Sequence, residues 1–230
     1  MDFARIVQIY LIQGGFTFFF LYMAYIVLKR GKKPLHLYLT SFYLSTTAGG
    51  ILNIIYANIF EATLVYIMHF LTYFLFCFSL VFLLIFTLII IKPAKIITFK
   101  FQILILILFG ILILGLLLFP SGIIIDETTN WKPEWSWSFF IYSIIVCTSI
   151  AILPTLYYSI RIYIKFESGY LKKKWKFFLI GISAYFFLFY GTSLSNTIGN
   201  DSFRFIWSLL SLPTLISLYL IYHGVGRQLE

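Results

Sequence analysis

The chain has 230 residues, of which 61% are hydrophobic and 11% are charged, with a mean hydropathy of +0.98 and a formal net charge of +9. Soluble domains contain about 45–50% apolar and about 25% charged residues, so this composition excludes an ordinary soluble protein. The sequence therefore predicts an integral membrane protein.

Seven stretches are long and apolar enough to cross a bilayer core of about 30 Å as helices, which takes about 20 residues each. In chain order they are Ile6–Leu28, Leu35–Asn58, Thr63–Ile91, Phe101–Phe119, Trp137–Ile160, Phe177–Ser195 and Phe205–Tyr222. They do not alternate with the period of two that a transmembrane β-barrel requires. No basic segment precedes the first stretch, so we expect a retained helix and not a signal peptide. The predicted fold is all-α: one domain, residues 1–230, forming a seven-transmembrane-helix bundle.

The distribution of basic residues predicts the orientation, because Lys and Arg in short loops stay on the cytoplasmic side of a membrane. One side receives fourteen of the seventeen basic residues, namely Lys29, Arg30, Lys32, Lys33, Lys92, Lys95, Lys100, Arg161, Lys165, Lys172, Lys173, Lys174, Lys176 and Arg227. The other side receives Arg5, Lys132 and Arg204. We therefore expect a multi-pass protein of the plasma membrane with its N-terminus outside and its C-terminus inside.

The densest group of basic residues lies between Arg161 and Lys176, which the helix boundaries predict to be the third inner loop. Its cations are Arg161, Lys165, Lys172, Lys173, Lys174 and Lys176. Topology and attraction to anionic headgroups explain such a group. A docking surface for a cytoplasmic protein is the other interpretation. Nucleic acid is not an expected partner, because no basic domain or base-stacking platform stands outside the membrane.

The longest segment between predicted helices, Pro120–Trp137, holds three Trp residues and acidic residues on the outer side. Indole rings prefer the membrane interface, so this segment is either a short lid at that interface or part of an ordinary aromatic belt. Cys77 and Cys147 lie well inside predicted helices and imply no disulfide framework.

Polar side chains gather in the outer halves of most predicted helices, where burying them in lipid is costly. Tyr66, His69 and Tyr73 are three and four residues apart and so share one helix face. Such stripes are best satisfied by facing one another, which predicts an outward-opening pocket for a small ligand. Its candidate ligand-binding residues are Gln13, Asn53, Glu61, Tyr66, His69, Tyr73, Tyr190, Ser193, Asn196, Arg204, Trp207 and Ser208. Hydrogen bonds between helices and an aromatic belt are the alternative explanation. An ion pair between Glu61 and Arg204 is also conceivable.

Several enzyme classes are disfavoured. A retinal Schiff base needs a Lys in the last helix, and Phe205–Tyr222 contains none. His36 and His223 fall at inner helix ends and His69 in an outer half, so the three do not converge on a metal. No Gly-x-Ser-x-Gly nucleophile elbow occurs. We therefore expect no enzyme, no catalytic residue, no metal and no cofactor.

Two segments near the C-terminus, ESGYLKKKWKFFLIGISAYFFLF and SLLSLPTLISLYLIYHG, carry a resemblance to a known family. They resemble the last helices of the seven-helix sensor regions found at the N-termini of some microbial histidine kinases. The resemblance implies a membrane region that senses a signal and passes it to a cytoplasmic kinase domain. Because the sequence ends eight residues after the last predicted helix, kinase activity is not expected and the output would pass through a separate partner.

The expected function is that of a receptor or sensor that binds a small ligand in the outer half and signals through a cytoplasmic partner. Pro154 and Pro213 are plausible hinges for such a change. One alternative is a transporter or channel for a small solute or ion, which requires a polar path through the inner half. Another is an accessory subunit that packs against a second membrane protein. The sequence leaves the oligomeric state open.

Overall fold

The computed structural model describes residues 6–91 and 96–226, so Arg5, Lys92, Lys95 and Arg227 lie outside the described residues. Its helices are η1 (Val7–Gln13), α2 (Gly14–Arg30), α3 (Pro34–Tyr56), α4 (Ala62–Ile91), α5 (Phe99–Leu114), η2 (Gly115–Leu118), α6 (Trp137–Cys147), η3 (Thr148–Ile152), α7 (Leu153–Lys165), α8 (Gly169–Ile198), α9 (Asp201–Ile221) and η4 (Tyr222–Gly226). Two short strands, β1 (Ile123–Ile124) and β2 (Glu134–Trp135), pair antiparallel. The prediction of an all-α fold is confirmed.

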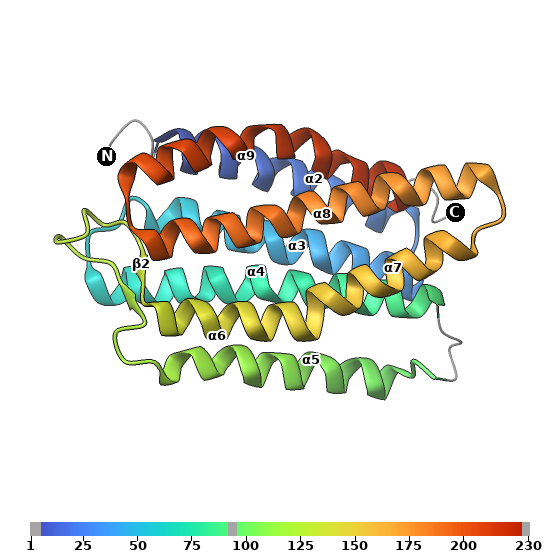
Figure 1. The fold of residues 1–230 in the computed structure, drawn as a ribbon, viewed down its shortest axis with the longest axis horizontal. Helices are drawn as coiled ribbons and strands as arrows, with labels where there is room; N and C mark the ends of the chain where they lie inside the picture. Colours follow the sequence, from blue (N-terminus) through green and yellow to red (C-terminus); the bar gives the residue numbers. More distant parts are fainter. Residues whose placement is uncertain (1–5, 92–95, 227–230) are drawn as a thin grey trace.

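The long helices run side by side along one axis and form a bundle (Figure 1). We call one end the hairpin end, since it holds the β1–β2 hairpin and the connections 57–61 and 199–200. The other end, with the connections 31–33 and 166–168, is called the basic end. The start of η1 lies at the hairpin end and the end of α9 lies at the basic end. Helix α5 lies at the edge of the bundle in this view.

Within the described residues, six helical segments are long and apolar enough to cross a membrane. They are Ile9–Arg30, Ala62–Ile91, Phe99–Leu118, Trp137–Lys165, Gly169–Ile198 and Asp201–Val225. This pattern indicates a multi-pass membrane protein. The helix α3 has 23 residues, about 34 Å, but is too polar to be among them. Its Thr, Ser, His and Asn side chains are largely buried, because α3 packs between α2 and α4.

One predicted span, Trp137–Ile160, is a bent helix made of α6, η3 and α7. Pro154 lacks the N–H that would bond the carbonyl one turn earlier, and its ring crowds that carbonyl. The π-helical turn η3, Thr148–Ile152, lies just before it and widens the helix there. The bend visible between α6 and α7 in Figure 1 therefore has an identifiable cause in the sequence.

The predicted third inner loop is wrong in its extent. Helix α8 begins at Gly169 and not at Phe177, so the Lys residues from 172 to 176 lie on its first turns. Lys favours helices, and a charged helix can project from the membrane without breaking its hydrogen bonds. The Trp175 indole N–H also donates to the carbonyl of Ser159 (2.7 Å), which ties the start of α8 to α7. Only residues 166–168 connect the two helices.

Candidate ligand-binding site

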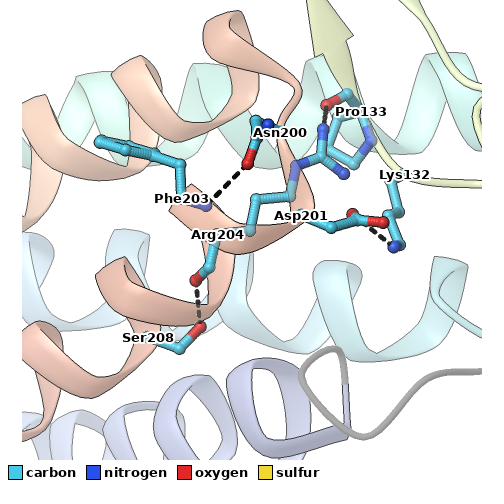
Figure 2. Close-up of polar contacts among 7 residues, drawn as sticks. All are labelled: Lys132, Pro133, Asn200, Asp201, Phe203, Arg204 and Ser208. Atoms are coloured by element: carbon cyan, nitrogen blue, oxygen red, sulfur yellow. Dashed lines mark hydrogen bonds and ion pairs between the residues drawn. The ribbon is translucent and has the colours of Figure 1, made fainter.

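The segment Pro120–Trp137, expected to be either a lid or part of an aromatic belt, contains a hairpin that is attached to the α8–α9 connection. Figure 2 shows Lys132 and Pro133 of the hairpin facing the start of α9. The Lys132 ammonium forms an ion pair with Asp201 (2.7 Å), and the Arg204 guanidinium donates to the Pro133 carbonyl (2.8 Å). The Asn200 side chain caps α9 by accepting from the Phe203 N–H (3.0 Å). These contacts hold the hairpin against the bundle.

A second attachment lies inside the bundle, at His69 of α4. The Trp135 indole N–H donates to Nε2 of His69 (3.1 Å), and the Tyr56 hydroxyl lies 2.8 Å from Nδ1. Because indole is only a donor, Nε2 must accept and the ring proton sits on Nδ1. All three side chains are buried. His69 is therefore a hydrogen-bonded packing residue that joins β2 to α3 and α4.

Beneath Trp135 lies a cavity of about 140 Å³ that is bounded by η1, α2, α3, α4, α8 and α9. Its described lining residues are Ile12, Gln13, Phe16, Thr17, Phe20, Thr46, Gly50, Asn53, Thr72, Tyr73, Phe76, Trp135, Tyr185, Leu188, Phe189, Thr192, Ser193, Asn196, Trp207, Ser211 and Leu218. The wall is mainly aromatic and aliphatic, with amides and hydroxyls distributed over it. Mostly apolar walls with a few polar groups are typical of small-molecule sites.

Six of the twelve predicted ligand-binding residues line this cavity: Gln13, Asn53, Tyr73, Ser193, Asn196 and Trp207. Glu61, Tyr66, His69, Tyr190, Arg204 and Ser208 are not among its lining residues. Tyr190 shares a hydrogen bond with Thr148 (2.7 Å), and Tyr66 packs against the core. The Ser208 hydroxyl donates to the Arg204 carbonyl (2.8 Å) (Figure 2). A role in ligand binding stays a prediction for all twelve.

The conceivable ion pair between Glu61 and Arg204 does not form. Glu61 instead accepts from the N–H groups of Thr63 (3.0 Å) and Leu64 (2.6 Å) at the start of α4. Arg204 reaches the hairpin, as described above. Glu61 thus caps unpaired N–H groups that begin α4, whereas Arg204 binds a carbonyl of the hairpin.

The Glu61 cap makes the start of α4 sensitive to acid. The Leu64 N–H, followed by the Thr63 N–H, holds the pKa of the Glu61 carboxyl below its ordinary value. Stability from such a group is present above the ordinary pKa and is lost as pH falls through the lowered one. We expect amide protection at Thr63 and Leu64 to fall on acidification, as measured by hydrogen exchange corrected for intrinsic rates. In Glu61→Gln protection should not change with pH; an equal change there would contradict the assignment.

Sequence reasoning did not assign several of the lining residues to the site, including Thr46 and Tyr185. The Tyr185 hydroxyl lies 2.5 Å from Ser79 Oγ and 3.2 Å from Thr46 Oγ1, at the middle of the bundle. Thr46 lies seven residues, about two turns, before Asn53, so the helical period places both on one face. That spacing is the sequence signal that places Thr46 beside Asn53 in the cavity wall.

The cavity ends on a packed core toward the basic end. Phe20, Phe42 and Tyr43 are fully buried and contact one another, with ring centroids 5.0–5.8 Å apart. Tyr185 adds an edge-on contact to Phe42 at 5.1 Å. Such aromatic clusters are close-packed and leave no room for a ligand.

The two cysteines meet beside the cavity wall. Cys77 of α4 and Cys147 of α6 are buried free thiols whose sulfur atoms lie 3.6 Å apart. The neighbouring Tyr73 hydroxyl donates to Ser143 (2.9 Å), also between α4 and α6. Within the described part of the chain, no group of three His, Cys, Asp or Glu side chains could hold a metal ion.

The predicted docking residues lie together at the basic end. Arg161 and Lys165 close α7, and Lys172, Lys173, Lys174 and Lys176 open α8. Arg161, Lys165, Lys173 and Lys176 are exposed. Lys172 lies over the Tyr163 ring (5.2 Å), and Lys174 lies 3.1 Å from Nε2 of His223. Four cations thus remain accessible to an anionic surface or partner.

No protein-family model, no curated protein and no solved structure matches this chain.

Proposed function

We propose that this protein is a receptor or sensor of the plasma membrane that binds a small molecule in the cavity and signals through a cytoplasmic partner. The observation that carries the proposal is a mid-bundle cavity whose wall holds unpartnered polar side chains. Both Gln13 and Thr72 line the cavity, and the Oε1 atom of Gln13 and the Oγ1 atom of Thr72 are buried without a hydrogen-bond partner among the described residues. Buried polar groups are nearly always paired, so an occupant that pairs them is expected.

The proposed topology has seven spans, with the hairpin end outside and the basic end inside. It counts α3 as the seventh span, because its polar side chains face protein and not lipid. The exposed cations at the basic end support a cytoplasmic location for it. The hairpin end carries few cations, and of these Lys132 is paired with Asp201.

Site-directed labelling tests this topology. In a Cys77→Ala/Cys147→Ala background, we expect Glu127→Cys on the hairpin to react with a membrane-impermeant maleimide in intact cells. Lys173→Cys should react only after the cells are permeabilised. Both side chains are exposed in the structure, so access is limited by the membrane alone. The reverse labelling pattern would invert the proposed orientation.

The cavity is placed so that an occupant could bias the helix arrangement. Its wall joins η1, α2, α3 and α4 on one side to α8 and α9 on the other, and α8 continues to the basic end. A ligand shifts such a bundle only by binding one arrangement better than the other. Pro213 inside α9 and the turn η3 are the points where the helices can bend most easily. The exposed cations of α7 and α8 would then present the change to a partner.

A substitution that fills the cavity can imitate an occupant. We expect Ser193→Phe, which projects a ring into the cavity from α8, to change amide hydrogen exchange in residues 161–176 at the basic end. The matched control is Ser138→Phe on the exposed face of α6, which should leave that segment unchanged. If Ser193→Phe folds normally but alters exchange only beside residue 193, the proposed coupling is wrong.

Transport is a second candidate, favoured by one observation on α3. The side chains of His36, Thr40, Tyr43 and Thr47 are buried, and their polar side-chain atoms have no partner within the described residues. These residues recur every three or four positions and so share one face. The face runs from the basic end toward the cavity. A flux of protons or small solutes in proteoliposomes that His36→Ala and Tyr43→Phe abolish would favour transport over sensing.

A further inference from the structure

The chemistry of the cavity narrows the class of ligand. We infer that the cavity selects an uncharged molecule of one aromatic ring that bears a group able both to donate and to accept a hydrogen bond, such as a primary carboxamide or a hydroxyl. This inference rests on the proposed function, since it concerns the ligand of the same site. Volume, charge and hydrogen bonding support it independently.

The volume limits the ligand to about one ring. The cavity measures about 140 Å³. An engineered apolar cavity of about 150 Å³ in another protein accepts benzene, so a monocyclic ligand matches the available space. A bicyclic or larger ligand would require helices to separate.

The lining disfavours a charged ligand. None of the described lining residues is Asp, Glu, Lys, Arg or His. Arg204, at the hairpin end, directs its guanidinium to the Pro133 carbonyl. A buried ion without a counter-charge loses its hydration and regains little, so an uncharged ligand is favoured.

Aromatic side chains form much of the wall around the space. Tyr73 stacks with Phe189 at 6.2 Å and meets the Trp135 ring edge-on at 4.7 Å. The Trp207 indole comes from α9 and donates to Thr192 (3.2 Å). The faces and edges of these aromatic side chains can contact the ring of a ligand in the offset and edge-on geometries that aromatic pairs favour. A cation could also bind to aromatic faces, which makes a quaternary ammonium the sharpest competing class.

Three carboxamides supply the hydrogen-bonding groups. Gln13, Asn53 and Asn196 reach the cavity from η1, α3 and α8. Gly50 packs against Thr17. Gln13 lies about one turn from Thr17 and Asn53 about one turn from Gly50, both toward the hairpin end, so the two amides lie at nearly the same level of the bundle. The Oε1 atom of Gln13 and the Oγ1 atom of Thr72 are buried and have no partner among the described residues. A ligand that both donates and accepts pairs these groups, whereas a plain hydrocarbon leaves them unpaired.

Matched probes test the inference on the full chain in lipid nanodiscs. The probes are benzamide (neutral, donor and acceptor), toluene (neutral, no hydrogen-bonding group), benzoate (anion) and benzyltrimethylammonium (cation). Binding is followed by calorimetry and by the fluorescence of Trp135 and Trp207, which line the cavity. We expect benzamide to bind about 10-fold or more tightly than each of the other probes, because it alone pairs the amides without bringing a charge.

Two variants locate the binding. Asn53→Leu keeps the size of the side chain and removes its amide, so benzamide affinity should fall about 10-fold while toluene affinity is kept. Asn58→Leu is the matched control, because Asn58 bonds Tyr10 and the Ile54 carbonyl outside the cavity. If Asn53→Leu does not fold, Thr72→Val serves the same purpose through its single hydroxyl.

The outcomes separate this inference from the proposed function. Tighter binding of benzoate or benzyltrimethylammonium overturns the inference and leaves a sensor for a charged ligand. Absence of binding by all four probes also overturns it. Equal loss of benzamide affinity in Asn58→Leu would place the binding elsewhere and overturn it too. The proposed function fails separately, if filling the cavity with Ser193→Phe leaves the basic end unchanged.

Discussion

Replacing His69 with Leu should lower the free energy of unfolding by about 2–4 kcal/mol and partly release the hairpin, which Lys132 and Arg204 still attach to the bundle. The substitution leaves the Trp135 indole N–H without an acceptor and removes one hydrogen bond of Tyr56, and all three side chains are buried. Each buried polar group left unpaired costs about 1–3 kcal/mol. Thermal unfolding in one fixed detergent measures the loss of stability. Hydrogen exchange in residues 120–136 measures the release.

A double-mutant cycle identifies the cause of that loss. Trp135→Phe removes the indole N–H that His69 accepts, so adding His69→Leu to it should cost about 1–2 kcal/mol less than adding it to the wild type. A general packing defect at position 69 would instead cost the same in both backgrounds. Equal costs would therefore contradict the hydrogen bond as the link between β2 and α4.

Replacing Gly181 with Ala should destabilise the protein by about 1–3 kcal/mol, the usual cost of overpacking. A Cβ atom at this position would lie 2.6 Å from Ile221 Cγ1 and 2.7 Å from the backbone nitrogen of Ile221. A backbone atom cannot rotate away, so α8 and α9 would have to separate. Gly224 packs equally closely against the backbone of Phe178. Small residues thus allow this close helix approach.

Gly169→Ala is the matched control, because it makes the same change in the same helix. A Cβ atom at Gly169 meets nothing within 4 Å, so the substitution should stabilise by about 0.4–1 kcal/mol through a less flexible unfolded chain. The measurement is the unfolding midpoint of both variants in the same detergent. Similar midpoints for the two variants would show that the α8–α9 contact tolerates a methyl group.

The site could be predicted only in part, for reasons that individual residues make clear. Asn53 and Ser193 lie on buried helix faces, and a helical period in the sequence reveals such faces. Depth predicted Glu61 and helical spacing with Ser208 predicted Arg204, yet each binds a backbone group outside the cavity. Trp135 belongs to a segment expected to be a lid or an aromatic belt, but its place over the cavity depends on His69, 66 residues away. A spacing rule cannot detect a contact of that kind.

The sequence by itself determined what depends on the preference of each residue for lipid or water. Long apolar segments must form helices in a bilayer, since no water is present to pair their backbone groups. Apolarity thus predicted the all-α fold and the approximate extents of the long helices, and charge predicted that most described cations gather at one end. Apolarity did not predict the start of α8, where lysines continue the helix beyond the apolar region.

Only the tertiary structure decided where the cavity lies and what lines it. A cavity depends on how each helix is rotated and registered against its neighbours, and pairs distant in sequence set that geometry. Gly50 against Thr17 and Gly191 against Trp207 are two such pairs. Apolarity is a property of a single residue and can be read from the sequence. The fit between two helix surfaces depends on residues of both helices, so the position of the cavity follows from packing and not from the spacing of residues in the sequence.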